Sequence, residues 1–255
     1  MRLHFEELGE GFPLVLLHGH TLDRRMWHTA APGLAAAGFR VIMPDLAGHG
    51  LSGPPAADST PAGDLADLLR DLGIDKAIIA GLSQGGAVAI NFALRFPELC
   101  AALIPIDAAL FGHRFAQWPG TKPYIALARS EGLASGLQAW LLDPLFASAL
   151  ASTAAPLIRE MVGQYPGHAW LEQAPSPVPP GPLDAVRLGE IAAPTLVLTG
   201  EHDLPDFLQI SEKLAAEIPG SHRRVISGAG HLVPLEQPKA FTAAVLQFLD
   251  DLNRR

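Results

Sequence analysis

The stretch AIIAGLSQGG, residues 77–86, places a serine in a Gly-x-Ser-x-Gly turn between two apolar segments. The β-branched run before the turn predicts a buried strand, and the Ala-rich segment after it predicts a helix. Glycines stand two positions before and two positions after Ser83, so a sharp strand-to-helix bend can expose its hydroxyl to a substrate. The turn predicts a nucleophilic serine, provided that a base and an orienting acid occur elsewhere in the chain.

Similar apolar runs recur along the first half of the chain. Their near-continuous apolarity is typical of strands that are buried on both faces of a parallel sheet. Leucines spaced at i, i+3, i+4 and i+7 between two of these runs predict an amphipathic helix. The predicted strands lie within residues 13–19, 39–45, 76–82 and 101–106, and the leucines are Leu65, Leu68, Leu69 and Leu72. This alternation predicts an α/β fold with a mostly parallel, doubly wound sheet.

The alternation stops after Asp107, and the next strand pattern comes only at residues 194–200. A last strand and a final helix that starts at Pro238 follow it. The intervening sequence has helical stretches at 122–130, 133–142 and 159–165, then a proline-rich connector at 174–182, and the last strand is expected at 223–226. We therefore expect an α/β core, residues 1–111 and 188–255, that is interrupted by a helical cap at residues 112–187.

Composition limits the class of partner. The 255 residues are 49% hydrophobic and 17% charged, with a net charge of −8 and no dense cluster of Lys and Arg. These features argue against binding to nucleic acid or to an anionic membrane surface. No apolar run is long enough to cross a bilayer, and no export signal is evident at the N-terminus. Cys100 is the sole cysteine, in an apolar run that predicts a core position, so we expect a cytoplasmic globular protein with a small-molecule substrate.

A base and an acid for Ser83 occur after two later predicted strands. His231 lies in the small-residue loop SGAGHLVP, residues 227–234, and Asp203 lies in the loop GEHDLPD, residues 200–206. The carboxyl ends of parallel strands meet at one edge of a sheet, where sites are built. Spacing alone leaves three other acids open: Glu201 and Asp206 in the same loop, and Asp107 at the end of an earlier strand. Asp206 also fits the N-cap of the helix that follows it.

The order serine, aspartate, histidine around a Gly-x-Ser-x-Gly turn resembles the α/β-hydrolase superfamily, in its serine-nucleophile branch. The resemblance extends over nearly the whole chain. Its matching segments are the His18-Gly19 loop, DLAGHGLS at 45–52, and residues 81–86, 200–203 and 228–238. In this family a helical cap is inserted between the sixth and seventh strands of the sheet, where residues 112–187 stand here.

The resemblance implies an oxyanion hole made by the backbone N–H groups of His20 and Gln84. Because only main-chain groups are needed, the side chains at these two positions are expected to be free to vary. The implied reaction is acyl transfer, in which Ser83 attacks a carbonyl, His231 carries the proton and Asp203 orients the imidazole. A serine at position 83 disfavours the dehalogenase and epoxide-hydrolase branches, which place an aspartate there.

Within the serine branch, the chain most resembles carboxylesterases and enol-lactonases, which implies a small to medium ester or lactone as substrate. A carbon–carbon bond hydrolase, a perhydrolase and a non-catalytic ligand-binding protein of the same fold remain alternatives. Aromatic residues of the cap are expected to line the pocket, Trp140 among them. No cofactor and no metal are expected, because no pair of histidines has the spacing of metal ligands. No pattern predicts the oligomeric state.

Overall fold

A central sheet of seven strands organises the computed structural model, which describes residues 3–171 and 183–254. The strand order is β1-β3-β2-β4-β5-β6-β7. All neighbours pair in parallel except β1, which pairs with β3 antiparallel. The strands are β1 (Phe5–Leu8), β2 (Phe12–Leu17), β3 (Phe39–Pro44), β4 (Ala77–Leu82), β5 (Cys100–Ile106), β6 (Leu196–Gly200) and β7 (His222–Ile226). The mostly parallel α/β sheet that the sequence predicts is confirmed.

Strand β4 lies at the centre of this sheet, between β2 and β5, and all six of its residues are buried. Strand β1 is at the edge and is half exposed, with two glutamates in its sequence FEEL. No continuous apolar run marks it, which explains why sequence reasoning missed this strand.

The predicted connector at 174–182 lies outside the described residues.

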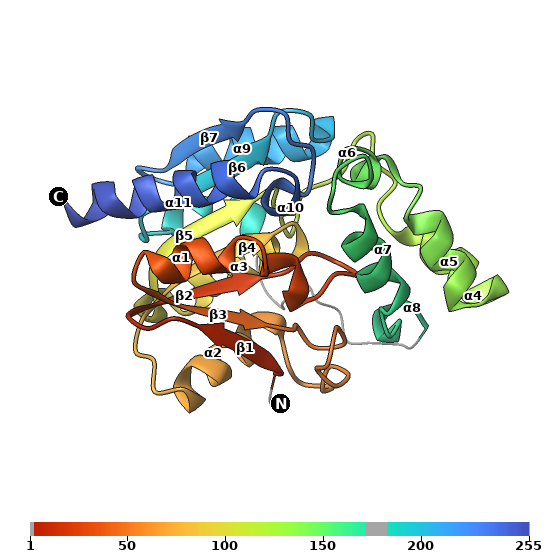
Figure 1. Ribbon diagram of the computed structural model, residues 1–255, viewed down its shortest axis with the longest axis horizontal. Coiled ribbons are helices and arrows are strands. Elements are labelled where there is room, and N and C mark those ends of the chain that lie inside the picture. The colour runs from red at the N-terminus through yellow and green to blue at the C-terminus, as the bar shows by residue number, and fades with distance from the viewer. Residues whose placement is uncertain (1–2, 172–182, 255) are drawn as a thin grey trace.

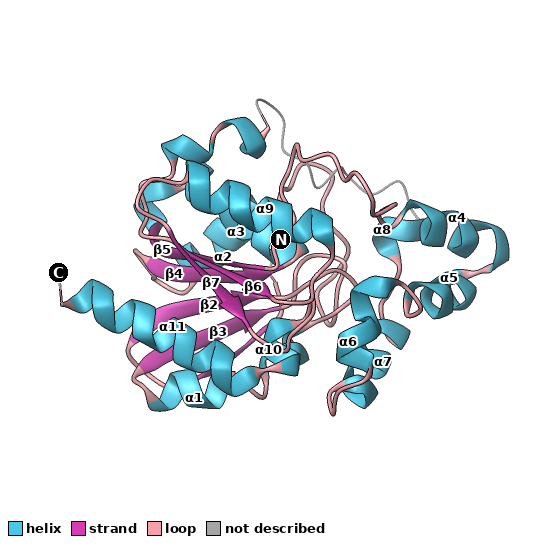
Figure 2. Cartoon of the chain, turned by 90° about the horizontal axis from the view of Figure 1, so that it is seen from above, coloured by secondary structure: helices cyan, strands magenta, loops and turns pink. Residues whose placement is uncertain are grey.

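Helices cover both faces of the sheet (Figure 2). On one face lie α1 (Ala31–Ala36) and α11 (Pro238–Asn253), and on the other lie α2 (Pro61–Asp71), α3 (Gln84–Arg95) and α9 (Pro205–Glu217). The predicted leucine stripe falls on α2, where Leu65, Leu68 and Leu69 are buried. None of the helices among residues 3–171 and 183–254 is long and apolar enough to cross a membrane.

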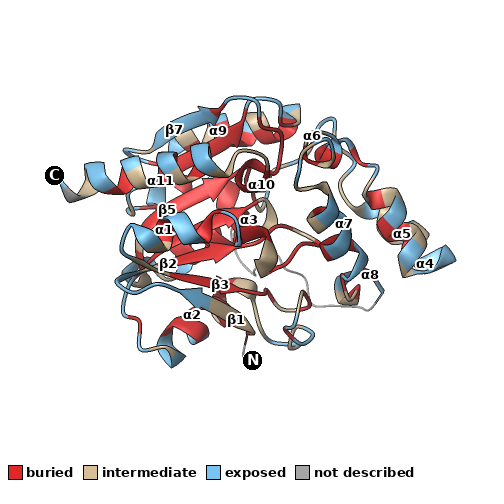
Figure 3. Cartoon of the chain, viewed as in Figure 1, coloured by how far each residue is buried: buried red, intermediate tan, exposed pale blue. Residues whose placement is uncertain are grey.

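In the described part of the chain, five short α-helices between β5 and β6 lie beyond the carboxyl ends of the parallel strands (Figure 1). We call this segment the cap. Its helices are α4 (Lys122–Glu131), α5 (Leu133–Trp140), α6 (Ala147–Leu150), α7 (Ala155–Gly163) and α8 (His168–Leu171). The first two agree with the predicted helices, whereas α7 begins and ends earlier than the predicted 159–165, because Pro156 fits the first turn of a helix. Figure 3 shows that the outer faces of the cap are exposed and that buried residues lie toward the core.

Cys100, the first residue of β5, is buried at 3% exposure. Burial raises the pKa of its thiol to about 12, so the thiol stays protonated and is a poor nucleophile. The core position that the sequence predicts for Cys100 is thus observed.

Candidate active site

The turn after β4 forces Ser83 into an unusual backbone conformation, with φ 52° and ψ −112°. A positive φ is strained for a residue with a side chain, and such strain is typical of functional sites. Positions 81 and 85 require glycine because neighbouring backbone atoms leave no room for a side chain. A Cβ on Gly81 would lie 2.2 Å from the Gly85 carbonyl oxygen, and one on Gly85 would lie 2.4 Å from the Leu17 carbonyl oxygen. The bend is therefore built by packing against the end of β2 as well as by the local sequence.

His231 and Asp203 meet at the same edge of the sheet. The ring Nδ1 of His231 lies 2.9 Å from Asp203 Oδ1 and 3.0 Å from Oδ2. Because the carboxylate accepts, Nδ1 carries the proton, and Nε2 has a free lone pair. Both side chains are buried, and Nε2 has no hydrogen-bond partner among the described residues. An imidazole held in this tautomer can take a proton at Nε2.

Glu201 and Asp206, the other two acids of the stretch 200–206, have different partners. Glu201 is exposed and accepts hydrogen bonds from the Ser227 hydroxyl and the Gly228 backbone. Asp206 lies in the first turn of α9, and its carboxylate accepts the backbone N–H groups of residues 116–118. The N-cap interpretation of Asp206 was therefore wrong, since the N-cap position is Leu204. Asp206 instead anchors the loop that leads into the cap.

Asp107 occupies the end of β5 beside the Asp203 loop, with a left-handed φ of 42° and no exposed surface. Its Oδ1 accepts the Gly200 N–H at 2.7 Å. Burial, together with the negative charge of Asp203, raises its pKa well above the ordinary value. The buried site therefore favours the protonated form of Asp107 over its charged form.

The loop that carries His231 is clamped by a residue that sequence reasoning missed. Glu236, in the short helix α10 (Val233–Glu236), accepts the backbone N–H of Gly230 and of Leu232, each at 2.9 Å. It also accepts the hydroxyl of Ser148 from the cap helix α6. These bonds fix the backbone on both sides of His231. The available signal was a glutamate five positions after the histidine.

The predicted oxyanion-hole residues, His20 and Gln84, are bonded to each other through their side chains. His20 Nδ1 donates to Gln84 Oε1 at 2.7 Å, and the Trp170 indole N–H donates to His20 Nε2 at 2.8 Å. An indole N–H can only donate, so Nε2 must be the acceptor and Nδ1 carries the proton. Burial and the nearby His49 lower the pKa of His20 to about 3, which keeps it neutral. The two side chains therefore have specific hydrogen-bond partners, beyond the main-chain role that the resemblance implies for these residues.

Ser83 and His231 share one small cavity under the cap. Its volume is about 30 Å³, which is room for roughly two water molecules. Trp140, which the sequence places at the pocket, is in its wall. The lining residues are Gly19, His20, Leu22, Leu82, Ser83, Trp118, Thr121, Trp140, Leu145, Phe146, His231 and Leu232. They include no Lys, Arg, Asp or Glu.

Comparison with known proteins identifies the family. The sequence matches the alpha/beta hydrolase fold family over residues 13–238. The chain belongs to this family.

The hydrolase is similar to proteins of more than one activity. It is 29% identical to the carboxylesterase YbfK of Bacillus subtilis (92% of this chain, 79% of the relative). It is 31% identical to a 2-hydroxy-6-oxo-6-phenylhexa-2,4-dienoate hydrolase of Burkholderia cepacia (97% and 91%). Among solved structures, a thermophilic esterase from Thermogutta terrifontis aligns with a TM-score of 0.80 at 33% identity (98% and 93%). The enol-lactonase from Burkholderia xenovorans LB400 aligns with a TM-score of 0.82 at 25% identity (97% and 96%).

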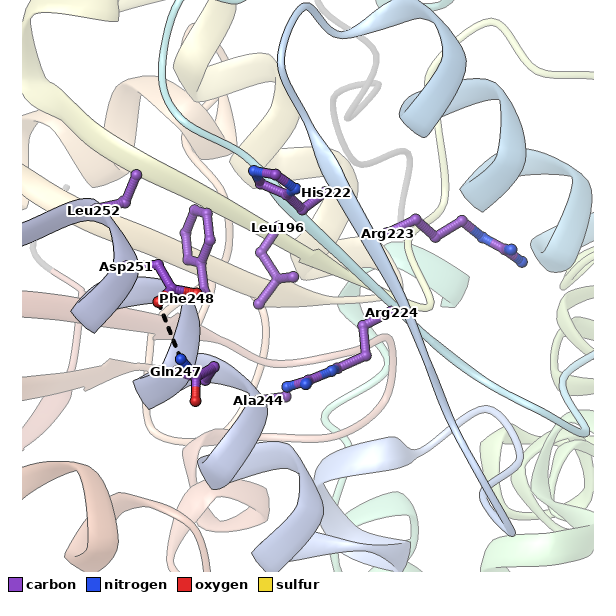
Figure 4. A pocket seen from close by; sticks show the side chains of 9 residues that line it. All are labelled: Leu196, His222, Arg223, Arg224, Ala244, Gln247, Phe248, Asp251 and Leu252. Carbon is purple, nitrogen blue, oxygen red and sulfur yellow. Dashed lines mark hydrogen bonds between the residues drawn. The ribbon is translucent and has the colours of Figure 1, made fainter. Parts of the chain in front are cut away.

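Larger hollows of the hydrolase lie away from this cavity. One of about 190 Å³ lies between β7 and α11, where Gln247 donates to Asp251 and the side chain of Arg224 extends toward α11, whereas that of Arg223 points away (Figure 4). Another of about 620 Å³ is lined by apolar residues such as Phe12 and Phe39 and by no titratable group. Neither holds a serine or cysteine, so neither offers a nucleophile comparable with Ser83.

Proposed function

We propose that this α/β hydrolase cleaves small, uncharged carboxylic esters or lactones through an acyl-enzyme on Ser83. The observation that carries the proposal is the pairing of His231 with Asp203, which leaves Nε2 unpartnered in the cavity that Ser83 also lines. A hydroxyl is a weak nucleophile until a base accepts its proton, and His231 is the available base.

In the proposed reaction, Ser83 Oγ attacks the substrate carbonyl and His231 Nε2 takes the serine proton. Asp203 accepts the Nδ1 hydrogen bond and stabilises the imidazolium that forms. The backbone N–H groups of His20 and Gln84 stabilise the oxyanion, and each such donor typically contributes about 3 to 4 kcal/mol of barrier lowering. His231 then gives the proton to the leaving alcohol. Water, deprotonated by His231, hydrolyses the acyl group and restores Ser83.

The cavity wall supports an uncharged substrate with a short acyl chain. Twelve residues line the cavity and none is Lys or Arg, so a substrate carboxylate has no lysine or arginine to pair with there. A buried unpaired charge is strongly disfavoured. The volume of about 30 Å³ also limits the chain that fits without movement of the cap.

A carbon–carbon bond hydrolase is the second candidate, because the Burkholderia cepacia relative is named as a hydrolase of a 2-hydroxy-6-oxo-dienoate. Its named substrate is a dienoate, and the lack of a lysine or arginine in the lining disfavours it here. The cavity therefore agrees better with the ester or lactone chemistry of the first proposal than with cleavage of a dienoate. The same argument disfavours any substrate that presents a carboxylate to Ser83.

A substrate panel tests this proposal. We expect aryl acetates to be hydrolysed with a higher kcat/KM than aryl octanoates, and small neutral lactones to be opened. Ser83→Ala should abolish both activities. Faster cleavage of a dienoate than of any ester would favour the second candidate. Failure to hydrolyse any ester or lactone, in protein whose Ser83 reacts with a fluorophosphonate, would favour a ligand-binding role.

A further inference from the structure

Two cap tryptophans contact the loop after β2, residues 18–21, which we call the oxyanion loop because it carries His20. The indole N–H of Trp170, in α8, donates to His20 Nε2 at 2.8 Å. The indole N–H of Trp140, at the end of α5, donates to Thr21 Oγ1 at 2.8 Å. Both tryptophans are buried, at 0% and 1% exposure. The cap therefore contacts the oxyanion loop through directional bonds as well as through apolar packing.

The bond from Trp170 continues into the second oxyanion-hole residue. His20 accepts from Trp170 on one ring nitrogen and donates to Gln84 Oε1 on the other, at 2.7 Å. Gln84 directly follows the nucleophile and begins α3. This chain of two hydrogen bonds links the side chains of both residues whose backbone N–H groups would bind the oxyanion. A single neutral tautomer of His20 satisfies both bonds.

The bond from Trp140 acts on the strained position next to His20. Thr21 has φ 59°, a conformation that is rare for a β-branched residue and persists only where its surroundings hold it. Its hydroxyl donates to the His20 carbonyl at 2.6 Å and accepts from Trp140. The single hydroxyl proton is used in the bond to the His20 carbonyl, and an oxygen lone pair accepts the Trp140 N–H. The two bonds are therefore compatible, and together they fix the orientation of the hydroxyl.

We propose that Trp140 and Trp170 are positioning residues that hold the oxyanion loop in its productive geometry. The inference rests on the proposed acyl-enzyme function and goes beyond it, because it gives the cap a part in transition-state stabilisation as well as in substrate selection. Donors aimed at an oxyanion work only at correct distances, so loss of either indole N–H should reduce reactivity even when the triad is intact.

The rate of Ser83 phosphonylation by a small fluorophosphonate tests the inference without a known substrate. Trp170→Phe and Trp140→Phe remove the N–H and keep an aromatic ring, and each should lower the second-order rate constant by about three- to tenfold, the effect of one hydrogen bond. Trp27→Phe is the matched control. Trp27 is equally buried, packs on Phe241, and its indole N–H has no partner among the described residues. Trp27→Phe should lower the stability of the protein, but its rate constant for phosphonylation of Ser83 should stay within twofold of the wild-type value.

A pair of Thr21 variants tests the same link from the core side. Thr21→Val removes the hydroxyl and keeps the shape, whereas Thr21→Ser keeps the hydroxyl. We expect Thr21→Val to label more slowly than Thr21→Ser. In the double variant Trp140→Phe with Thr21→Val, the losses should not add, because one bond is removed in both. Additive losses would overturn the inference.

Kinetics on an aryl ester separate positioning from general damage. The tryptophan variants should lower kcat with little change in KM, and should weaken a trifluoromethyl ketone inhibitor by the same factor as kcat/KM. Equal labelling rates for wild type, Trp140→Phe and Trp170→Phe would overturn the inference, as would a loss in Trp27→Phe as large as theirs. If wild type labels at Ser83 but hydrolyses no ester or lactone, the proposed function fails, and the labelling series still decides the positioning role.

Discussion

Two carboxyl groups, those of Asp203 and Asp107, lie close together near His231. Asp203 pairs with the imidazole at 2.9 Å, whereas burial and the charge of Asp203 raise the pKa of Asp107. Asp203→Asn should lower kcat by about 10⁴-fold, because the amide favours the wrong imidazole tautomer. Asp107→Asn should change kcat by less than about threefold, since the amide oxygen can still accept the Gly200 N–H and the buried site favours an uncharged side chain. Steady-state kinetics on both variants decide which acid serves His231, and the reverse ranking would contradict the assignment.

Glu236 gives a second prediction for a single residue. Glu236→Gln leaves one of the two backbone N–H groups, at Gly230 or Leu232, without its acceptor. The His231 loop should then shift, and kcat should fall about tenfold, since small displacements of a catalytic group are costly. Glu201→Gln is the control, because that exposed carboxylate binds Ser227 and Gly228 instead. Equal activity of the two variants would show that the clamp does not position His231.

Cap elements set the shape of the cavity. Leu145, in the 3-10 helix Pro144–Phe146 between α5 and α6, lines it, whereas Leu142, just before that helix, is 83% exposed. Leu145→Ala should open space for a longer acyl chain and raise the butyrate-to-acetate ratio of kcat/KM by about tenfold, as expected for the volume of one or two methylenes. Leu142→Ala should leave the ratio unchanged. Because the loss of a buried leucine costs about 2 to 5 kcal/mol, rates are compared well below the unfolding temperature.

Elements with a strong local pattern could be predicted from the sequence, and elements shaped by long-range contacts could not. Continuous apolar runs predicted five strands, β2 to β6, the shorter stretch at 223–226 predicted β7, and the glycines around Ser83 predicted the bend after β4. The edge strand β1 has no such pattern. Position after a strand predicted where His231 and Asp203 lie. The bonds of Trp170 to His20 and of Asp206 to residues 116–118 join segments 150 and about 90 positions apart, and no local signal marks them.

For the whole molecule, buried neutral histidines beside the site make stability depend on pH. Burial lowers the pKa of His18 to about 4 and, with the nearby His18, that of His49 to about 3. The unfolded chain binds protons on these rings below about pH 6.5 and the folded chain does not. Their contribution to stability is therefore complete above that pH and is lost as the pH falls toward the folded pKa values.

His49→Asn isolates one of these groups. The asparagine amide can still donate to the Ala47 carbonyl, as His49 Nδ1 does, and His49 Nε2 has no partner among the described residues. Between about pH 4.5 and 6, the free energy of unfolding of wild type should fall more steeply than that of the variant, by up to about 1.4 kcal/mol per pH unit. Urea unfolding at several pH values measures both slopes. Parallel slopes would mean that His49 titrates normally in the folded protein.

The central claim is that Ser83 carries the acyl group, and a carbamoylating aryl carbamate tests it most directly. Such a reagent transfers its carbamoyl group to an activated serine, releases the phenol and leaves a slowly hydrolysed adduct. We predict stoichiometric phenol release, an adduct that peptide mass spectrometry maps to Ser83, and parallel loss of aryl acetate hydrolysis. Ser83→Ala should show none of these reactions. An adduct on another residue, or aryl acetate hydrolysis that persists in Ser83→Ala, would contradict the account.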